Sequence, residues 1–201
     1  NIFTNYIFKL AKLNVIEIRL IDTMAMCNDC PKFDTTKNDY YTQKQMWENI
    51  SHLIPKDKVI YECCLLNSKS RSKEYLEELG YSVVGDKSWD CLKYYPINYD
   101  IILTNPPFEN KIKKQILTHL VKLDKPFIIV LNSMNVYSKY FRDIFGDNIK
   151  YLQMIIPQGK IKFEECNEEG RLVKCPKDPA FYCCYVAYKM DIPPEKLWLT
   201  K

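Results

Sequence analysis

Apolar and polar residues follow two periods along this chain, and together they predict strands and helices in alternation. Short apolar runs bounded by polar residues are typical of buried strands, which we expect at 58–64, 81–86, 99–104, 125–132, 150–156 and 180–188. Apolar residues spaced three and four apart predict amphipathic helices at 35–54, 70–80, 109–123 and 136–146. The charged segment 157–179 is expected to be a long loop before the last strand.

This alternation predicts one α/β domain. Strands joined by helices of this length favour a mostly parallel, doubly wound sheet with helices on both faces. We place the domain at 39–190, after an N-terminal helical extension at 1–38 and before a C-terminal tail at 191–201. In open sheets of this kind, ligands bind beyond the carboxyl ends of the strands, where the strand order reverses. Residues that directly follow strands are therefore the first candidates for a functional site.

The composition indicates a folded protein with a full core. The 201 residues are 47% hydrophobic and carry a formal net charge of +4, which permits contact with nucleic acid without requiring it. No apolar run reaches the roughly 18 residues that are needed to span a bilayer, so no membrane association is expected. Charged residues near the N-terminus also interrupt any signal-like apolar core.

The cysteines indicate free thiols in a reducing, intracellular setting. There are nine of them, an odd number. Two adjacent pairs, Cys63–Cys64 and Cys183–Cys184, fall in expected strands, where neighbouring side chains point to opposite faces. The segment CNDC at 27–30 has the spacing of a metal-binding pair, but neither a second such pair nor a nearby pair of histidines accompanies it. The sequence therefore predicts no metal site.

The segment ILTNPPFEN (102–110) is the strongest candidate for chemistry. Pro106 and Pro107 form a stiff corner without N–H donors, between an expected strand and an expected helix. The side-chain carbonyl of Asn105 and the main-chain carbonyl of Pro106 could accept both hydrogens of the exocyclic amine of adenine, which frees the nitrogen lone pair for attack on a methyl group. Phe108 offers a flat face on which an extruded base can stack. The simpler interpretation is a stiff connector with no chemical role.

With its neighbouring segments, this motif resembles class I S-adenosylmethionine-dependent N6-adenine methyltransferases of the NPPF type. It is similar above all to the compact enzymes of large DNA viruses and phages. The resemblance covers 39–190 and rests on DYYTQKQMWENI (39–50), VIYECC (59–64), LGYSVVGDKSWDCL (79–92) and YDIILTNPPF (99–108). It implies a Rossmann-like methyltransferase fold, with a mostly parallel seven-stranded sheet and a C-terminal antiparallel hairpin. It also implies S-adenosylmethionine as cofactor and adenine in DNA or RNA as substrate.

The resemblance assigns catalytic roles to the four residues of the corner. Asn105 and Pro106 would orient the amine, Pro107 would stiffen the turn, and Phe108 would stack on the base. A related class of enzyme methylates the side-chain amide of glutamine in proteins, but its motif typically ends in Tyr. Phe108 therefore favours a base as the substrate, and the amide remains an alternative.

The resemblance also assigns five residues to the cofactor. Tyr41 and Thr42 would lie along its methionine end, and Glu62 would be the acidic residue after the first strand. Asp86 and Asp90 compete for two roles, which are to hold the ribose hydroxyls and to accept from the amine of the cofactor's adenine. We favour Asp90 for the amine, because WDCL matches the family's pattern of Asp followed by two apolar positions. Asp86 could equally be a turn residue at the strand end.

The cofactor loop ECCLLNSKS (62–70) departs from the family pattern. Leu66 and Ser68 stand where the family has Gly, which allows a tight turn and a close approach of the main chain to the ligand. A second function therefore remains open, that of a methyltransferase-like protein with weak or lost cofactor binding. Such a protein would act as a nucleic-acid-binding or partner subunit.

Basic residues near the expected strand ends support a nucleic-acid partner. They are Lys69, Arg71, Lys73, Lys111, Lys113, Lys114, Lys160 and Lys162. Each alone is typical of a solvated face, but together they could steer a phosphate backbone toward the site. The chain has no further domain for target recognition, so we expect a short target, loose specificity, or recognition by a protein partner or second copy in a homodimer. The expected location is the cytoplasm or nucleus, and for a viral or phage protein that of the host cell.

Overall fold

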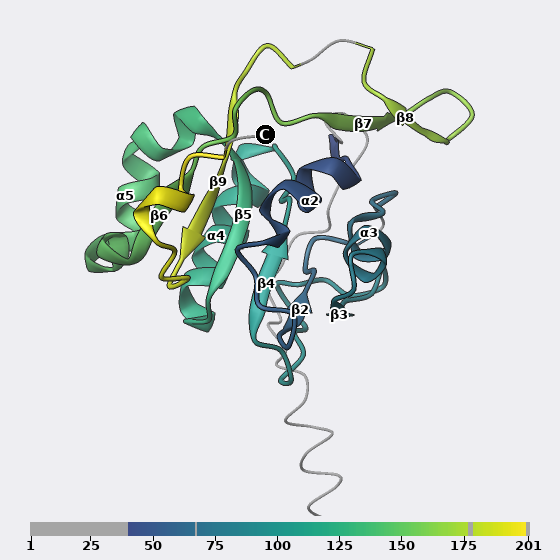
Figure 1. Ribbon diagram of the computed structural model, residues 1–201. Helices are drawn as coiled ribbons and strands as arrows, with labels where there is room; N and C mark the ends of the chain where they lie inside the picture. Colours follow the sequence, from purple (N-terminus) through teal and green to yellow (C-terminus); the bar gives the residue numbers. More distant parts are fainter. Residues whose placement is uncertain (1–39, 67, 177–178, 200–201) are drawn as a thin grey trace, which may run out of the picture.

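The computed structural model describes residues 40–66, 68–176 and 179–199. Its main strands are β2 (Val59–Tyr61), β3 (Ser82–Val84), β4 (Ile101–Thr104), β5 (Phe127–Asn132), β6 (Leu152–Ile155) and β9 (Cys183–Tyr188). Its α-helices are α2 (Lys44–Ser51), α3 (Ser72–Glu78), α4 (Asn110–Leu123) and α5 (Lys139–Phe145). The 3₁₀ helices are η1 (Ser133–Tyr137), η2 (Gly146–Tyr151) and η3 (Pro194–Lys196). The order of strands and helices confirms the expected alternation (Figure 1).

The six main strands form one sheet in the order β3-β2-β4-β5-β9-β6. The pairs β2–β3, β2–β4 and β4–β5 are parallel, whereas β9 runs antiparallel to both of its neighbours. The expected α/β class and mostly parallel sheet are confirmed. The expected seventh strand of this sheet is not present among the described residues, and the segment between β3 and β4 makes turns, one of which begins at Asp90. The main-chain N–H groups of Lys93 and Tyr94 both donate to the Asp90 carbonyl at 2.8 Å.

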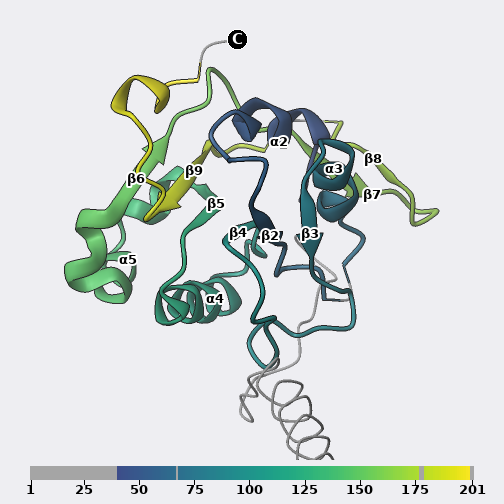
Figure 2. The same cartoon turned by 60° about the horizontal axis from the view of Figure 1, so that its bottom comes forward.

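Alternate residues of each strand face opposite sides of the sheet and build two separate cores. Ile60 and Leu103 face α2 and α3, and belong to the core that contains Trp47. Tyr61 and Ile102 face α4 and α5 on the other side. Figure 2 shows the two pairs of helices on opposite faces of the sheet. The doubly wound arrangement predicted from the sequence is therefore present.

The segment expected as the loop 157–179 contains a hairpin, so this expectation was wrong. Strand β7 (Phe163–Cys166) pairs antiparallel with β8 (Leu172–Lys174) and with the short strand β1 (Tyr41–Thr42). Buried Phe163 anchors the start of the hairpin, and charged residues such as Glu164 and Lys174 lie opposite one another across it. These charges conceal the strand pattern in the sequence. The segment also separates β6 from β9, so the expected closing hairpin is not a simple one.

The C-terminal residues pack against β6, at the edge of the sheet. The N–H of Ile156 donates to the Leu197 carbonyl at 2.7 Å, and the N–H of Leu199 donates to the Ile156 carbonyl at 2.9 Å. Ile192 is buried in the core beside them. The expected N-terminal extension and the CNDC segment lie outside the described residues. Within 40–66, 68–176 and 179–199, no helix combines the length and apolar character needed to cross a bilayer.

Candidate active site at the switch point of the sheet

The strand order reverses at β2, which lies between β3 and β4. Because these three strands are parallel, their carboxyl ends meet at one edge of the sheet. Glu62 directly follows β2, and Asn105 directly follows β4. The hydroxyl of Thr104 donates to Oε1 of Glu62, so the two strand ends are in direct contact. The structure therefore brings the expected cofactor-side and base-side residues to the same place.

Asn105 is held in one orientation and leaves its carbonyl oxygen unpaired. Its Nδ2 donates to the main-chain carbonyl of Tyr40 at 2.7 Å, which places Oδ1 on the other side of the amide group. Among the described residues, Oδ1 is buried and has no hydrogen-bond partner. An unpaired buried carbonyl costs about 1–3 kcal/mol of stability. Such a group persists most readily where a ligand supplies the missing donor.

The double-proline corner is fixed from both of its sides. Pro106 is buried, and Glu109 caps α4 by accepting from the N–H groups of Lys111 (2.8 Å) and Ile112 (3.0 Å). The ammonium group of Lys113 donates to the Phe108 carbonyl at 3.4 Å and to Oδ1 of Asn110 at 3.0 Å. Lys113 is only 4% exposed, and this burial lowers its pKa. It therefore supports the corner and does not face phosphate groups as we expected.

The Phe108 ring lies in a cluster of aromatic side chains from three separate segments. Its centroid is 5.2 Å from Phe181 and 5.7 Å from both Tyr40 and Phe163. The ring packs against the core but remains partly exposed. Tyr40 precedes β1, Phe163 begins β7 and Phe181 precedes β9. The hairpin missed from the sequence thus contributes directly to the surroundings of the motif.

Glu62 is buried at the centre of the switch point, with 2% of its surface exposed. Its Oε1 also accepts from the N–H of Cys64 at 3.1 Å. Burial raises the pKa of this carboxyl to about 8, although the hydrogen bonds from Thr104, Cys64 and Ser72 act in the opposite direction. This raised pKa favours the neutral carboxyl near pH 7.

This protonation makes the stability of the protein depend on pH. Between pH 4.5 and about 8, the folded protein keeps the Glu62 proton while the unfolded chain releases it. The free energy of unfolding should therefore fall as the pH rises through this window. In Glu62→Gln, which keeps a neutral acceptor, this part of the fall should be missing. At about 1.4 kcal/mol per pKa unit, the difference between the two profiles is on the order of a few kcal/mol.

Urea unfolding of both proteins at intervals between pH 4 and pH 9, in metal-free buffer, measures the difference. Groups that do not interact with Glu62 titrate equally in both proteins and cancel in the comparison, whereas the Cys64 thiol, whose charge acts on Glu62, contributes to the difference. Parallel profiles for wild type and Glu62→Gln would show that Glu62 is already ionised in the folded protein at neutral pH.

The two residues of β1 lie between the cofactor loop and Asn105. The hydroxyl of Tyr41 accepts from the N–H of Lys69 in the loop at 3.4 Å. Thr42 is 1% exposed, and its Oγ1 has no hydrogen-bond partner among the described residues. Tyr41 is therefore in contact with the cofactor loop, and both residues lie on a strand where the sequence predicted part of a helix over 35–54.

Asp86 and Asp90 both anchor turns after β3, but in different surroundings. Asp86 is exposed, and hydrogen bonds from the hydroxyl (2.6 Å) and N–H (2.8 Å) of Ser88 lower its pKa. It also lines an open cleft of about 410 Å³. The other lining residues are Leu65, Lys73, Glu74, Glu77, Gly85 and Lys87. Asp90 is 7% exposed and accepts from the N–H of Leu92 at 3.1 Å. Asn105 does not line the cleft, so the cleft could hold only a distant part of a ligand.

At this edge of the sheet, a glycine directly after β3 allows a close approach of two main-chain segments, in place of a glycine in the cofactor loop. Gly85 has a φ of +139°, and a Cβ atom on it would lie 2.2 Å from the Glu62 carbonyl oxygen. The loop itself folds inward, with Leu65 1% exposed and its carbonyl accepting from the N–H of Ser68 at 2.9 Å. Sequence reasoning missed Gly85, and it missed Tyr40 and Thr104 as partners of expected site residues. A glycine directly after a strand was the available signal for Gly85.

Comparisons with known proteins find little similarity. No protein-family model matches the sequence, and no curated protein matches it. Among solved structures, a SAM-dependent O-methyltransferase from Thermotoga maritima is similar with a TM-score of 0.36 and 10% sequence identity. The match covers 76% of this chain and 67% of that chain. The assignment of the fold rests on the strand order and strand directions described above.

Proposed function

We propose that this protein transfers a methyl group from S-adenosylmethionine to N6 of adenine in nucleic acid. The observation that carries the proposal is the unpaired, buried Oδ1 of Asn105 at the switch point. The Tyr40 carbonyl holds Nδ2, so only the acceptor atom of the amide is left without a partner. A primary amine on a base is a donor that suits this atom, and the partly exposed Phe108 ring beside it suits the face of the base.

The residues around the cofactor loop fit S-adenosylmethionine through their polar atoms. Oγ1 of Thr42 is buried without a partner, and the carboxylate of Asp86 is exposed, so both could contribute a hydrogen bond to a bound cofactor. Tyr41, Glu62 and Asp90 are already engaged and would shape the site. When bound, the cofactor supplies an electrophilic methyl group on a sulfonium. Asn105 and Pro106 would orient the amine, Pro107 would keep the corner rigid, and Phe108 would hold the base.

An exposed aromatic surface at the same edge of the sheet supports nucleic acid as the substrate. Tyr137 is 72% exposed, Met134 is 70% exposed and Tyr182 is 63% exposed. The N–H of Ser133 donates to the Tyr182 carbonyl at 2.9 Å, which holds these segments together at the carboxyl end of β5. The ammonium group of Lys160 lies 5.1 Å from the Tyr182 ring centroid. Exposed rings combined with a cation are typical of surfaces that stack unpaired bases.

The buried loop favours a second candidate function, a methyltransferase-like subunit that binds nucleic acid without using the cofactor. Leu65 fills space beside Gly85, within the segment where the family has its glycine turn. Isothermal titration of the protein with S-adenosylmethionine, with and without an oligonucleotide, separates the two candidates. Binding supports the enzyme, and no binding in either experiment supports the subunit.

Transfer of labelled methyl groups tests the proposal itself. The protein is incubated with methyl-labelled S-adenosylmethionine and single-stranded or double-stranded DNA and RNA, and the nucleosides are then separated. We expect label in N6-methyladenine. Label in another nucleoside or in the protein would assign a different acceptor, and cofactor binding without any transfer would contradict the proposal.

A further inference from the structure

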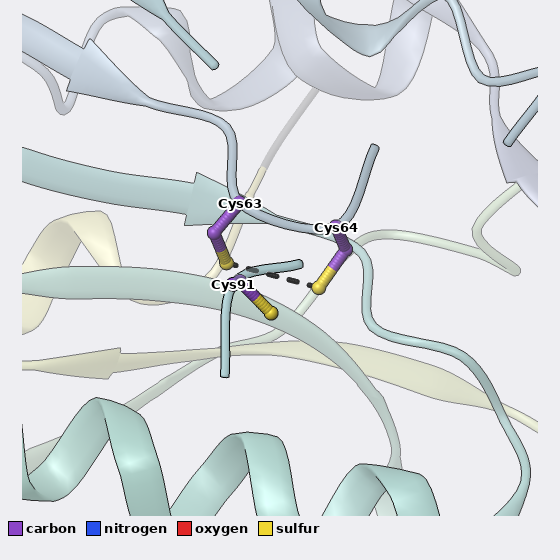
Figure 3. Close-up of side chains that lie close together, drawn as sticks. All are labelled: Cys63, Cys64 and Cys91. Atoms are coloured by element: carbon purple, nitrogen blue, oxygen red, sulfur yellow. Dashed lines mark hydrogen bonds between the residues drawn. The ribbon is translucent and has the colours of Figure 1, made fainter. Parts of the chain in front are cut away.

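Three cysteine thiols meet beside the switch point, where the sequence predicted no cluster. Cys63 and Cys64 follow Glu62 at the end of β2, and Cys91 follows Asp90 in the turns after β3. Figure 3 shows the three side chains pointing toward one another from these two segments. Their Sγ atoms all lie within 4.8 Å of one another, and those of Cys63 and Cys64 are 3.7 Å apart.

The expectation that adjacent cysteines point apart was wrong for this pair and is confirmed for the other. Strand β2 ends at Tyr61, so Cys63 and Cys64 are not held in the alternating geometry of a strand. Cys183 and Cys184 lie within β9, and their side chains belong to the two opposite cores. The cluster is therefore a product of the turn after β2 and has no counterpart at β9.

The sulfur positions match the dimensions of a tetrahedral zinc site. A Zn–S bond of about 2.3 Å places two tetrahedral sulfur ligands roughly 3.8 Å apart. The separation of 3.7 Å between Cys63 and Cys64 already fits this edge, and Sγ of Cys91 lies within 4.8 Å of both. Thiolates are also the ligands that Zn²⁺ binds most readily in proteins.

The burial of the cluster leaves one side open. Cys63 is 3% exposed and Cys91 is 2% exposed, whereas Cys64 is half-buried and gives access to the site. Three thiolates and Zn²⁺ carry a net charge of −1, which is less costly to bury than the −2 that a monovalent ion would leave. Lys93 is two residues after Cys91, and its ammonium group lies 3.6 Å from Oδ2 of Asp90, so this ion pair adds no net charge beside the cluster.

We propose that Cys63, Cys64 and Cys91 bind one Zn²⁺ ion as thiolates, with the fourth coordination position open to water. Three Zn–S bonds form, and the three thiol protons pass to solvent. The ion connects the cofactor loop after β2 to the turns after β3. In this chain it takes over the ordering of a loop that has no glycines of its own. The site exists whether or not the protein is a methyltransferase.

Titration of the reduced, metal-free full-length protein with Co²⁺ tests the site, because thiolate ligands give Co²⁺ a strong charge-transfer absorption near the ultraviolet. Cys27 and Cys30 are first replaced by Ser in the background protein, so that this CxxC pair cannot bind the metal. We expect one equivalent of Co²⁺ to bind, with visible bands of tetrahedral intensity, and Zn²⁺ to displace it. In that background Cys91→Ser should weaken binding by roughly 100-fold, whereas Cys175→Ser should leave it unchanged.

Thermal unfolding followed by circular dichroism shows whether each variant is folded. If Cys91→Ser does not fold, Cys64→Ser at the half-buried position gives the same test. No charge-transfer band in the folded background protein would overturn the proposal. A band that survives both Cys91→Ser and Cys64→Ser would also overturn it. Neither result depends on methyl transfer, so this site and the proposed function can fail separately.

Discussion

Replacement of Asn105 with alanine is expected to lower methyl transfer by roughly 100- to 1000-fold with little change in stability. Oδ1 of Asn105 is the acceptor proposed for the adenine amine, and loss of one oriented hydrogen-bonding group at a reacting centre typically has an effect of this size. The free energy of unfolding should change little, because the substitution has two opposing effects. The variant loses the 2.7 Å hydrogen bond to the Tyr40 carbonyl, but it also removes the unpaired buried oxygen.

Two further variants make this experiment specific. Asn49→Ala removes an exposed asparagine from α2, far from the corner in the sequence, and should keep full activity. Asn105→Asp keeps an acceptor but turns a second oxygen toward the Tyr40 carbonyl, so its activity should also be low. Rates are measured with labelled cofactor under single-turnover conditions, and unfolding is measured in parallel. Unchanged transfer in a folded Asn105→Ala protein would remove this side chain from the mechanism.

Replacement of Gly85 with alanine is expected to destabilise the fold by about 3–5 kcal/mol. The φ of +139° is unfavourable for any residue with a Cβ atom, which alone costs about 1–3 kcal/mol. The added Cβ would also lie 2.2 Å from the Glu62 carbonyl oxygen and 3.3 Å from Cδ1 of Leu65. The first neighbour is main chain at the end of β2 and cannot rotate away. The carboxyl ends of β2 and β3 would have to separate, and the switch point would be distorted.

Alanine variants at two other glycines serve as controls that distinguish backbone strain from steric overlap. Gly80 has a φ of +85° with no atom within 4 Å of an added Cβ, so Gly80→Ala should show strain alone, at about 1 kcal/mol. Gly159 has neither strain nor a close neighbour, and Gly159→Ala should be nearly neutral. Urea denaturation gives the free energies. Equal values for Gly85→Ala and Gly80→Ala would show that β2 and β3 are not in close contact at this point.

The sequence predicts the parts of this site that depend on local pattern. Strand, corner and helix around Asn105 follow from neighbouring residues, and the parallel topology then brings Glu62 to the same edge. The Tyr40 carbonyl lies 65 residues from its partner Asn105 and could not be assigned by periodicity. The same holds for Cys91, which reaches Cys63 only because β2 and β3 are neighbours. Contacts between separate segments depend on packing, which single-sequence patterns do not contain.

The seven-stranded expectation came from the resemblance, and the segment after β3 is where this chain departs from it. The strand signals in the sequence itself correspond to the six strands observed in the main sheet. Direct patterns in the residues were therefore more accurate here than the strand count of the resembling family.

The pairing of Ile156 with Leu197 and Leu199 affects the tendency of this protein to aggregate through the edge of its sheet. Strand β6 is the last strand of the sheet, and an open strand edge can recruit a strand from another molecule. The C-terminal residues occupy the hydrogen-bonding groups of Ile156, just beyond β6. Pro157 follows Ile156, and Pro193 and Pro194 come shortly before Leu197. Residues 197–199 therefore cover the sheet edge at Ile156, and removal of residues 192–199 would expose it to edge-to-edge pairing.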